Sequence, residues 1–325
     1  MIPCQNLSNP LKFHIGMFIA NKEETLLETI MKNLNTKQDT GFIAGIMETF
    51  KMRLKAFSEK LQTGISKDLC EDGKVIFGPF LSTRLGMCLG INNVKSKACT
   101  YNCIYCKSGN TSCCSICCDT CLNAWNLASC VRRKITDLQK EGVEINYVAF
   151  MPDGEATLDS NIGRKIQLIR EMGVKTAVFT NASLLWNYNV QQNLLSADNV
   201  IVKIDTVNAE TWEKINRPHL RLSLNAILES VREFASQFRG ELSTETVIVD
   251  GYKDNSEEIK ELGEYFASLN AVASDFSFVD NSKLATQKIT DPMMHLNLTD
   301  MIKRKIPGAV ILGCKEANYY QAATG

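Results

Sequence analysis

The chain has 325 residues, and its 36 Lys and Arg residues balance its 36 Asp and Glu residues, so the formal net charge is zero. This balance argues against a protein whose whole surface binds nucleic acid or anionic lipid, although it leaves room for a local basic patch. Hydrophobic residues make up 45% of the sequence, and no apolar stretch approaches the ~18 residues of a membrane span, so we expect a globular protein outside the membrane.

The first segment, residues 1–76, predicts two amphipathic helices. Apolar residues recur at helical spacing from Leu26 to Leu34 and again from Ile43 to Leu61. We interpret this segment as a small helical N-terminal extension that packs on the main domain or on a partner.

Residues 77–281 alternate short β-type runs with helical patterns. Six such repeats with nearly continuous apolar strands predict an α/β fold with a parallel sheet, wound open or curled toward a barrel. A sheet of this kind binds ligands at the carboxyl ends of its strands. Residues 282–325 have weak periodicity and predict a C-terminal tail, or an incomplete end of the chain. The expected strands are Cys88–Val94, Ile145–Met151, Thr176–Thr180, Val200–Asp205, Thr244–Val249 and Phe276–Val279.

Cysteine is the unusual residue, with 13 in the chain and nine of them between residues 99 and 130. A secreted disulfide scaffold would spread its cysteines over a short chain, whereas this chain is long and shows no signal peptide. The clustering therefore indicates metal or iron–sulfur ligation in a reducing compartment, and we expect a cytoplasmic protein.

Three of these cysteines, Cys99, Cys103 and Cys106, form a C-x3-C-x2-C motif in the first expected βα loop. Thiolates at this spacing can converge on one cuboidal [4Fe–4S] cluster and leave its fourth iron without a protein ligand. Such an open iron is what a cluster needs in order to bind a further molecule.

With this motif the chain resembles the radical SAM superfamily, which has C-x3-C-x-(aromatic)-C in the same loop. The segment 150–158 resembles the Gly-Gly-Glu segment of that superfamily, and 180–181 resembles its Thr-Asn-Gly turn. More narrowly, 89–92 and 216–219 resemble the branch that contains the tRNA wyosine-base synthases and their uncharacterised bacterial relatives.

The resemblance implies a partial (β/α)6 TIM-like barrel that holds a [4Fe–4S] cluster and S-adenosylmethionine. One electron would cleave S-adenosylmethionine to methionine and a 5′-deoxyadenosyl radical, which abstracts a hydrogen atom from the substrate. It also implies a low-potential electron donor of the flavodoxin or ferredoxin type. The substrate stays open between a tRNA base, a peptide and a small molecule.

The resemblance also assigns residues to the methionyl end of S-adenosylmethionine. Asp153, Gly154 and Glu155 would approach its amino group through backbone and carboxylate, and Thr180 and Asn181 would help at the same end.

Further residues would serve the adenosine and substrate side. Tyr105 would lie near the adenine, and Asp205 or Lys203, with Glu245, would face the ribose and the substrate. One departure matters here, because Ala182 stands where the superfamily usually has Gly. Ala182 must therefore avoid positive φ or accept strain.

A second group of cysteines lies in an insert, residues 113–130. Cys114, Cys117, Cys118 and Cys121 could hold an auxiliary iron–sulfur cluster or a zinc ion. The alternative is a loop of reduced thiols without metal. Cys130 lies on a helical pattern, so we expect it to be packed.

Two other functions remain open at this point. One is an activating enzyme of the glycyl-radical type, which acts on a partner protein. The other is an inactive relay protein that carries a cluster.

Overall fold

The computed structural model describes residues 75–249, 256–269, 271–279, 299–304, 306 and 308–311. All of them belong to the second of the two units into which the chain divides, residues 66–325. The two helices expected within residues 1–76 lie outside the described residues. Within the described part, no helix is both long enough and apolar enough to cross a membrane.

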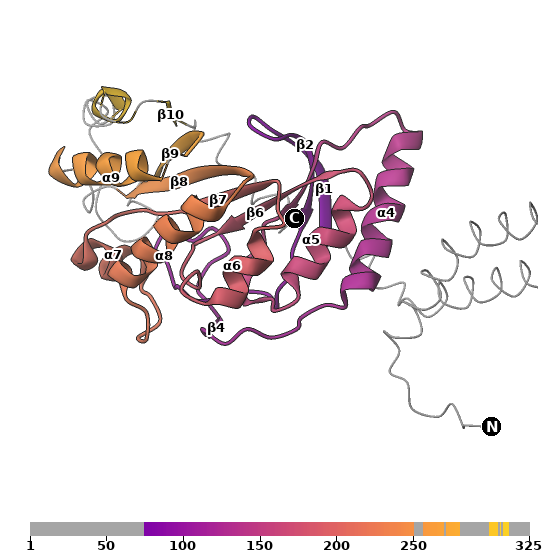
Figure 1. Cartoon of the computed structure of the whole chain (residues 1–325), viewed down its shortest axis with the longest axis horizontal. Coiled ribbons are helices and arrows are strands. Elements are labelled where there is room, and N and C mark those ends of the chain that lie inside the picture. The colour runs from indigo at the N-terminus through magenta and orange to yellow at the C-terminus, as the bar shows by residue number, and fades with distance from the viewer. Residues whose placement is uncertain are drawn as a thin grey trace, which may run out of the picture. The chain divides into compact units, whose positions relative to one another are not determined.

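An eight-stranded sheet forms the framework of this unit (Figure 1). The spatial order is β1-β2-β5-β6-β7-β8-β9-β10; β1 runs antiparallel to β2, and every other neighbouring pair is parallel. The strands are β1 (Ile76–Ser82), β2 (Gly86–Ile91), β5 (Tyr147–Phe150), β6 (Lys175–Thr180), β7 (Asn199–Lys203), β8 (Glu241–Val249), β9 (Ala273–Val279) and β10 (Ala309–Ile311).

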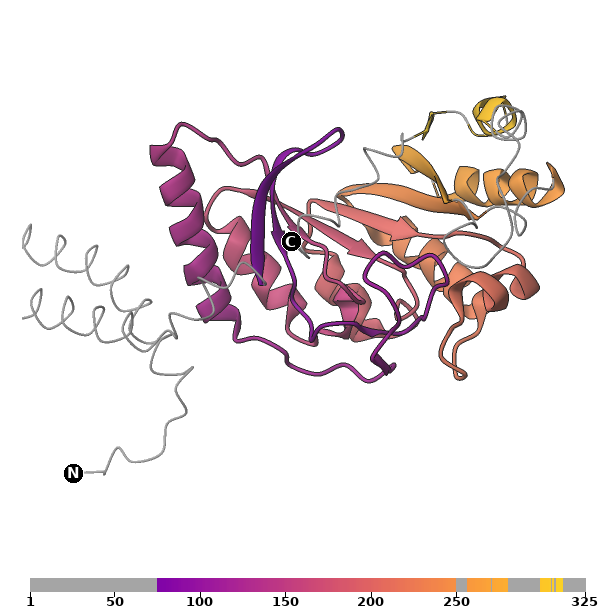
Figure 2. The same cartoon turned by 180° about the vertical axis from the view of Figure 1, so that it is seen from behind.

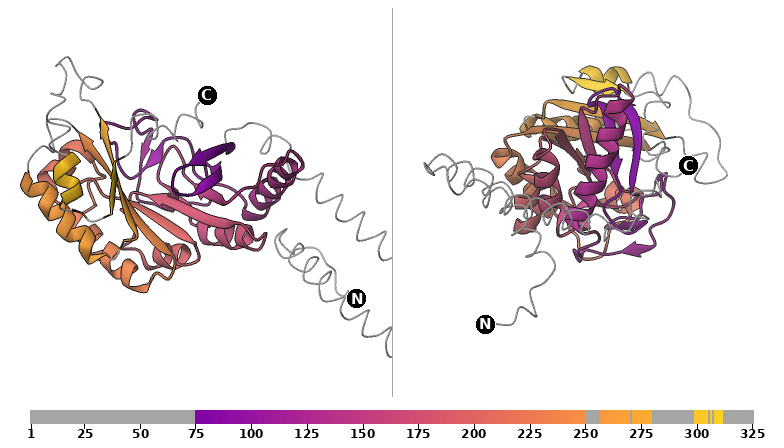
Figure 3. Two further views of the ribbon diagram at one scale, coloured as in Figure 1. Left: turned by 90° about the horizontal axis from the view of Figure 1, so that it is seen from above. Right: turned by 90° about the vertical axis from the view of Figure 1, so that its right-hand side faces the viewer.

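Helices connect the parallel strands and lie along one side of the sheet (Figure 3). The longest helix in the described part of the chain is capped by Asn123, whose side chain accepts hydrogen bonds from the backbone N–H groups of Trp125 and Asn126. It buries Leu127, Val131, Ile135 and Leu138, which recur at helical spacing on one face. The helices are α4 (Ala124–Lys140), α5 (Ile162–Arg170), α6 (Tyr188–Leu194), α7 (Ala209–Asn216), α8 (Leu224–Gln237) and α9 (Ser256–Ser268).

All six expected strands are present, with ends that shift by up to three residues. The sequence pattern missed β1, because Gly78-Pro79 interrupts it and its pairing with β2 is irregular between Phe77 and Phe80. It also missed α7 and the three-residue strand β10. Since β10 pairs with β9, the sheet continues past residue 281, the expected end of the core, into the expected C-terminal tail.

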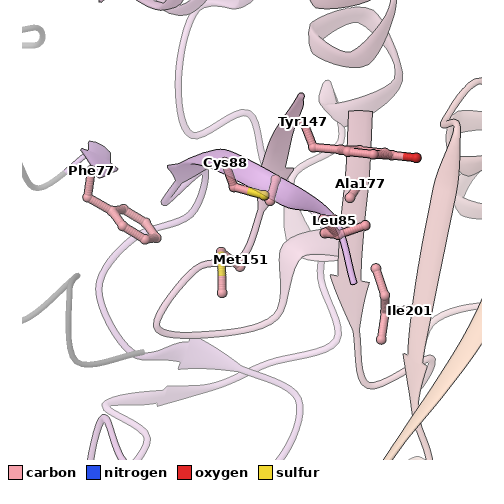
Figure 4. Close-up of a cluster of buried hydrophobic side chains, with 8 residues drawn as sticks. Phe77, Leu85, Cys88, Tyr147, Met151, Ala177 and Ile201 are labelled. Atoms are coloured by element: carbon pink, nitrogen blue, oxygen red, sulfur yellow. The ribbon is translucent and has the colours of Figure 1, made fainter. Parts of the chain in front are cut away.

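A buried apolar cluster covers the face of the sheet opposite the helices (Figure 4). Alternate strand residues point to opposite faces, so Ala149 and Ala177 lie in this cluster while Val148 and Val178 face the helices. The polar residues that follow the same strands at their carboxyl ends make up the candidate site. The cluster consists of Phe77, Leu85, Cys88, Tyr147, Ala149, Met151, Ala177 and Ile201.

Candidate cluster and cofactor site

The loop of residues 99–106, here called the cysteine loop, is fastened to the end of α7 by main-chain hydrogen bonds. The Asn102 N–H donates to the Asn216 carbonyl at 3.0 Å, and the Ile104 N–H donates to the Ile215 carbonyl at 2.9 Å. Tyr101 forms an antiparallel bridge with Pro218. This ladder fixes the backbone from which the three motif cysteines project.

Burial is the main influence on the acidity of two motif thiols, Cys99 and Cys103. It raises the pKa of Cys103 to about 11, with a further contribution from Asp205, while Lys203 and Asn216 oppose the shift. Burial also raises the pKa of Cys99, and Glu155 adds to that rise, followed by smaller contributions from the neighbouring Cys103 and Cys106. A bare thiolate is therefore unfavourable at Cys99 and at Cys103.

This donor set fits an iron–sulfur cluster. Cationic iron would supply the positive charge that the buried thiolates lack. Within the described residues, no three Cys, His, Asp or Glu side chains converge on one ion. A cuboidal cluster has no need of such a point, because each cysteine binds a different iron atom.

The segment after β5 lies directly against the cysteine loop. The Glu155 N–H donates to the Ala98 carbonyl at 2.9 Å. A Cβ atom on Gly154 would lie 2.0 Å from the same carbonyl oxygen, so only glycine permits this approach. Asp153 is held by Asn92 Nδ2 at 2.9 Å and by Ser96 Oγ at 2.7 Å.

The Glu155 carboxylate, 2% exposed, joins the ends of β5 and β6. Its Oε1 accepts hydrogen bonds from Thr157 N and Oγ1 and from Thr180 Oγ1, and its Oε2 accepts one from Asn181 N at 2.8 Å. Burial raises the pKa of Glu155, although these hydrogen bonds oppose the shift. Oε1 accepts three hydrogen bonds and Oε2 accepts one, so only Oε2 has a lone pair left for a further donor.

Asn181 links the β6 turn to the cysteine loop. Its Nδ2 lies 2.8 Å from Thr100 Oγ1 and 3.7 Å from Cys99 Sγ. The next residue, Ala182, is buried at φ +60°, so it accepts the strain anticipated from the sequence. A left-handed conformation costs a non-glycine residue about 1–2 kcal/mol.

A second polar group centres on Asp205, which is 4% exposed. Its Oδ2 accepts hydrogen bonds from the Tyr105 hydroxyl and from Asn216 Nδ2, the latter at 2.7 Å. Asn216 Nδ2 also lies 3.4 Å from Cys103 Sγ. Sequence reasoning did not single out Asn216 as a site residue, because the pattern missed the helix α7 that ends with it.

Lys203 completes this group. Its Nζ lies 3.3 Å from Asp205 Oδ1 and 4.6 Å from the centroid of the Tyr105 ring. Burial opposes its charge, but Asp205, Glu245 and Cys103 outweigh burial, and the pKa of Lys203 is raised. The lysine therefore stays protonated beside the cysteine loop.

Charged residues continue from Lys203 across the sheet. Lys203 pairs in register with Glu245 on β8, and Glu245 pairs with Asp275 on β9, so the three side chains share one face. Arg84, from the β1–β2 turn, forms an ion pair with Asp275. Burial is the main cause of the raised pKa of Glu245, with Asp205 and Asp275 adding to it.

The structure thus gathers the predicted site residues into two groups. Cys99 of the cysteine loop lies near Asp153, Gly154, Glu155, Thr180 and Asn181 at the carboxyl ends of β5 and β6, and Cys103 and Tyr105 lie near Lys203 and Asp205 at the carboxyl end of β7, where Lys203 pairs with Glu245 in the middle of β8.

The cysteine insert is docked at two places. Its strand β4 (Cys113–Cys114) pairs with β3 (Ala98–Cys99), which makes Cys114 the register partner of Cys99. Further along, Asp119 bridges to Asp159.

The thiols of the insert point to separate acceptors. Cys114 Sγ lies 3.6 Å from the Thr100 carbonyl and Cys118 Sγ 3.4 Å from the Thr157 carbonyl. Cys117 is exposed, and Cys121 Sγ lies 3.9 Å from the Asp119 carbonyl. An auxiliary metal on these thiols stays a prediction. Cys130 is buried in α4, as expected, and is disulfide-bonded.

The chain is similar in sequence to several known proteins. No family model matches the chain. It is 37% identical over 196 residues to the UPF0026 protein MJ1312 of Methanocaldococcus jannaschii, a match that covers 60% of each chain. It is 30% identical over 193 residues to the UPF0026 protein slr1464 of Synechocystis, covering 56% of this chain and 67% of that protein. The chain thus spans 60% of the length of the first of these relatives.

Solved structures give the fold. TYW1 with a lysine-pyruvate adduct bound matches with a TM-score of 0.52 at 15% identity, over 74% of this chain and 81% of that one. Streptococcus suis SuiB bound to the precursor peptide SuiA matches with a TM-score of 0.54 at 14% identity, over 95% and 64%. A radical SAM methyltransferase from Sphaerobacter thermophilus matches with a TM-score of 0.54 at 14% identity, over 72% and 69%. These likenesses confirm an α/β fold with a mainly parallel sheet that resembles the partial barrels of radical SAM enzymes.

Proposed function

The chain belongs to the UPF0026 family, and we propose that it is a radical SAM enzyme that cleaves S-adenosylmethionine reductively at a [4Fe–4S] cluster. The observation that carries this proposal is the cysteine loop. It bears Cys99, Cys103 and Cys106 and contacts the residues that follow β5 and β6, at the carboxyl end of a mainly parallel sheet that resembles radical SAM partial barrels.

Cys99, Cys103 and Cys106 would hold the cluster. When bound, the cluster supplies one electron and an open iron for the amino and carboxylate groups of S-adenosylmethionine. Asn181 and Asn216 donate hydrogen bonds toward Cys99 Sγ and Cys103 Sγ. Hydrogen bonds to ligand sulfurs are one means by which a protein sets a cluster's reduction potential.

We assign the segment 153–155 and the turn 180–181 to the methionyl end of the cofactor. Support comes from Gly154, whose missing side chain lets the main chain approach the cysteine loop. The Glu155 carboxylate keeps this edge in place through its bonds to Thr180 and Asn181.

We assign Tyr105, Lys203 and Asp205 to the adenosine side and Glu245 to the substrate side. Lys203 carries a positive charge that its surroundings favour, and Asp205 orients the Tyr105 hydroxyl. Glu245 and Asp275 lie farther along the same face, where a substrate can meet the cofactor. The substrate remains a tRNA base, a peptide or a small molecule.

We also propose a cytoplasmic location. Nine of the ten described cysteines are free thiols, and cluster ligation needs its cysteines reduced.

The test is anaerobic reconstitution followed by measurement of iron, acid-labile sulfide and 5′-deoxyadenosine with dithionite as reductant. A single cluster would give about four iron and four sulfide per chain, and an auxiliary cluster about eight of each. We expect Cys103→Ser to lose cluster iron and 5′-deoxyadenosine formation.

Cys113→Ser is the matched control, because Cys113 is an exposed cysteine outside the motif. Wild-type protein that binds no iron, or a Cys103→Ser variant that forms 5′-deoxyadenosine at the wild-type rate, would overturn the proposal.

A further inference from the structure

The loop between α7 and α8, residues 217–223, projects beside the cysteine loop and is here called the tip loop (Figures 1 and 2). Arg217 and Arg221 are exposed, and Leu220 is 100% exposed. Within the described part of the chain, neither arginine forms an ion pair. The tip loop therefore presents two unneutralised positive charges on either side of an unburied apolar side chain.

The tip loop is joined rigidly to the cysteine loop. The His219 N–H donates to the Thr100 carbonyl at 2.9 Å, and the Asn102 N–H donates to the Arg217 carbonyl at 3.1 Å. His219 Nδ1 accepts a hydrogen bond from the Arg221 N–H at 3.2 Å, which holds the turn. A molecule bound at the tip loop is thus only a few residues from the motif cysteines.

Arg217 occupies a strained position. It caps α7 with φ +44°, in the left-handed region where glycine is the usual residue. An arginine there costs about 1–2 kcal/mol relative to glycine. Strain of this kind tends to persist where the side chain has a use.

We propose that the tip loop is the docking surface for an acidic electron-donor protein, a low-potential ferredoxin or flavodoxin. This inference rests on the proposed function, which needs one external electron for each cleavage. One electron leaves the reduced donor, which is thereby oxidised by one electron, and enters the cluster. Because the whole chain has no net charge, attraction of an acidic donor must come from a local patch such as this one.

The features of the tip loop favour a protein over an RNA partner. RNA-binding surfaces generally combine many cations along the backbone with aromatic side chains on which bases stack. Residues 217–223 contain only two cations and no Phe, Tyr or Trp, and their one ring, His219, is partly buried with its Nδ1 bonded to the Arg221 N–H. A small patch that combines Arg with an exposed apolar residue is typical of protein–protein contacts.

The test compares two double charge reversals in the full-length protein. Arg217→Glu/Arg221→Glu changes the tip loop, and Arg132→Glu/Arg133→Glu makes the same charge change on the exposed face of α4. Binding of an oxidised ferredoxin and an oxidised flavodoxin is measured by calorimetry at low and high salt. We expect the tip variant to bind the donor about tenfold or more weakly at low salt and the α4 variant to bind within about twofold of wild type.

A second variant separates docking from folding. Leu220→Ala keeps the charges and changes a fully exposed side chain, so it should leave the thermal transition unchanged while weakening donor binding about twofold to fivefold. Rates of cluster reduction by the protein donor should fall in parallel, whereas reduction by dithionite should stay at the wild-type rate.

The outcomes separate this inference from the proposed function. Equal donor binding by the tip variant and wild type would overturn the docking surface, even if S-adenosylmethionine is cleaved with dithionite. Loss of binding to a tRNA pool with donor binding intact would also overturn it, in favour of an RNA surface. Failure of cleavage with dithionite in the wild type would instead overturn the proposed function.

Discussion

The polar residues at the ends of β5 and β6 differ from those on β7 to β9 in how their charges are satisfied. Glu155 is buried, and both of its oxygens accept hydrogen bonds from fixed neighbours. Glu245 is half-buried, and within the described residues its carboxylate has no hydrogen bond or ion pair. The Glu155 carboxylate is therefore held in one position, whereas the Glu245 carboxylate is free to accept a hydrogen bond.

This difference has a physical basis in the two carboxylates' surroundings. Hydroxyl and main-chain N–H groups stabilise the Glu155 carboxylate through hydrogen bonds, so it needs no ion pair. Glu245 faces Lys203, Asp205, Asp275 and Arg84, a set of charges that interact at longer range and can readjust. One face of the sheet thus combines a carboxylate fixed by hydrogen bonds with a carboxylate surrounded by other charged groups.

The largest expected effect comes from removing the Glu155 carboxylate. Glu155→Ala leaves the buried donors on Thr157, Thr180 and Asn181 without an acceptor, and we expect it to lower the free energy of unfolding by about 3 kcal/mol or more. Denaturant unfolding measures this. Glu245→Ala is the matched control and should cost less than about 1 kcal/mol, since it removes no hydrogen bond within the described residues. Equal losses of unfolding free energy in the two variants would contradict the difference between the two regions.

A smaller, pH-dependent effect tests the surroundings of Glu245. Because the pKa of Glu245 is raised in the folded state, that state binds its proton more tightly than the unfolded state does. Stability from this group is therefore present at low pH and is lost as the pH rises from the unfolded pKa through the raised folded pKa.

Unfolding of wild type and Glu245→Gln should be compared across that pH range. Glu245→Gln should match wild type at low pH and gain stability relative to it as the pH rises. A difference that does not change with pH would show that Glu245 ionises as freely in the folded protein as in the unfolded chain.

The smallest effect concerns the turn after β6. Ala182→Gly removes the strain of φ +60° but adds unfolded-state entropy, so we expect a net gain of about 0.5 kcal/mol in unfolding free energy. Ala177→Gly, a buried alanine on β6 with ordinary φ, should instead destabilise by about 1 kcal/mol. Thermal or denaturant unfolding of the two variants measures the change in stability. A loss of stability in both variants would mean that Ala182 is not strained.

The region at the ends of β5 and β6 was the easier one to predict from the sequence. Buried parallel strands read as continuous apolar runs, and the cysteine motif is local, so both can be recognised within a few residues. By contrast, the contact of Asn216 with Cys103 and Asp205 depends on α7, and the pairing of Arg84 with Asp275 joins distant strands. The sequence placed Glu245 with Lys203 and Asp205 but gave no sign of Asp275 and Arg84, because strand register and curvature bring these two to Glu245.

The pairing of β3 with β4 has a consequence for any metal or cluster that the cysteine loop would hold. Cys99 and Cys114 are register partners, so main-chain pairing closes the chain between them into a loop. Closing a loop and ordering its residues costs conformational entropy, and here the main-chain pairing already meets part of that cost. A metal or cluster bound by this loop would then have less disorder to remove, which would raise its affinity in the way that rigidifying any binding loop does.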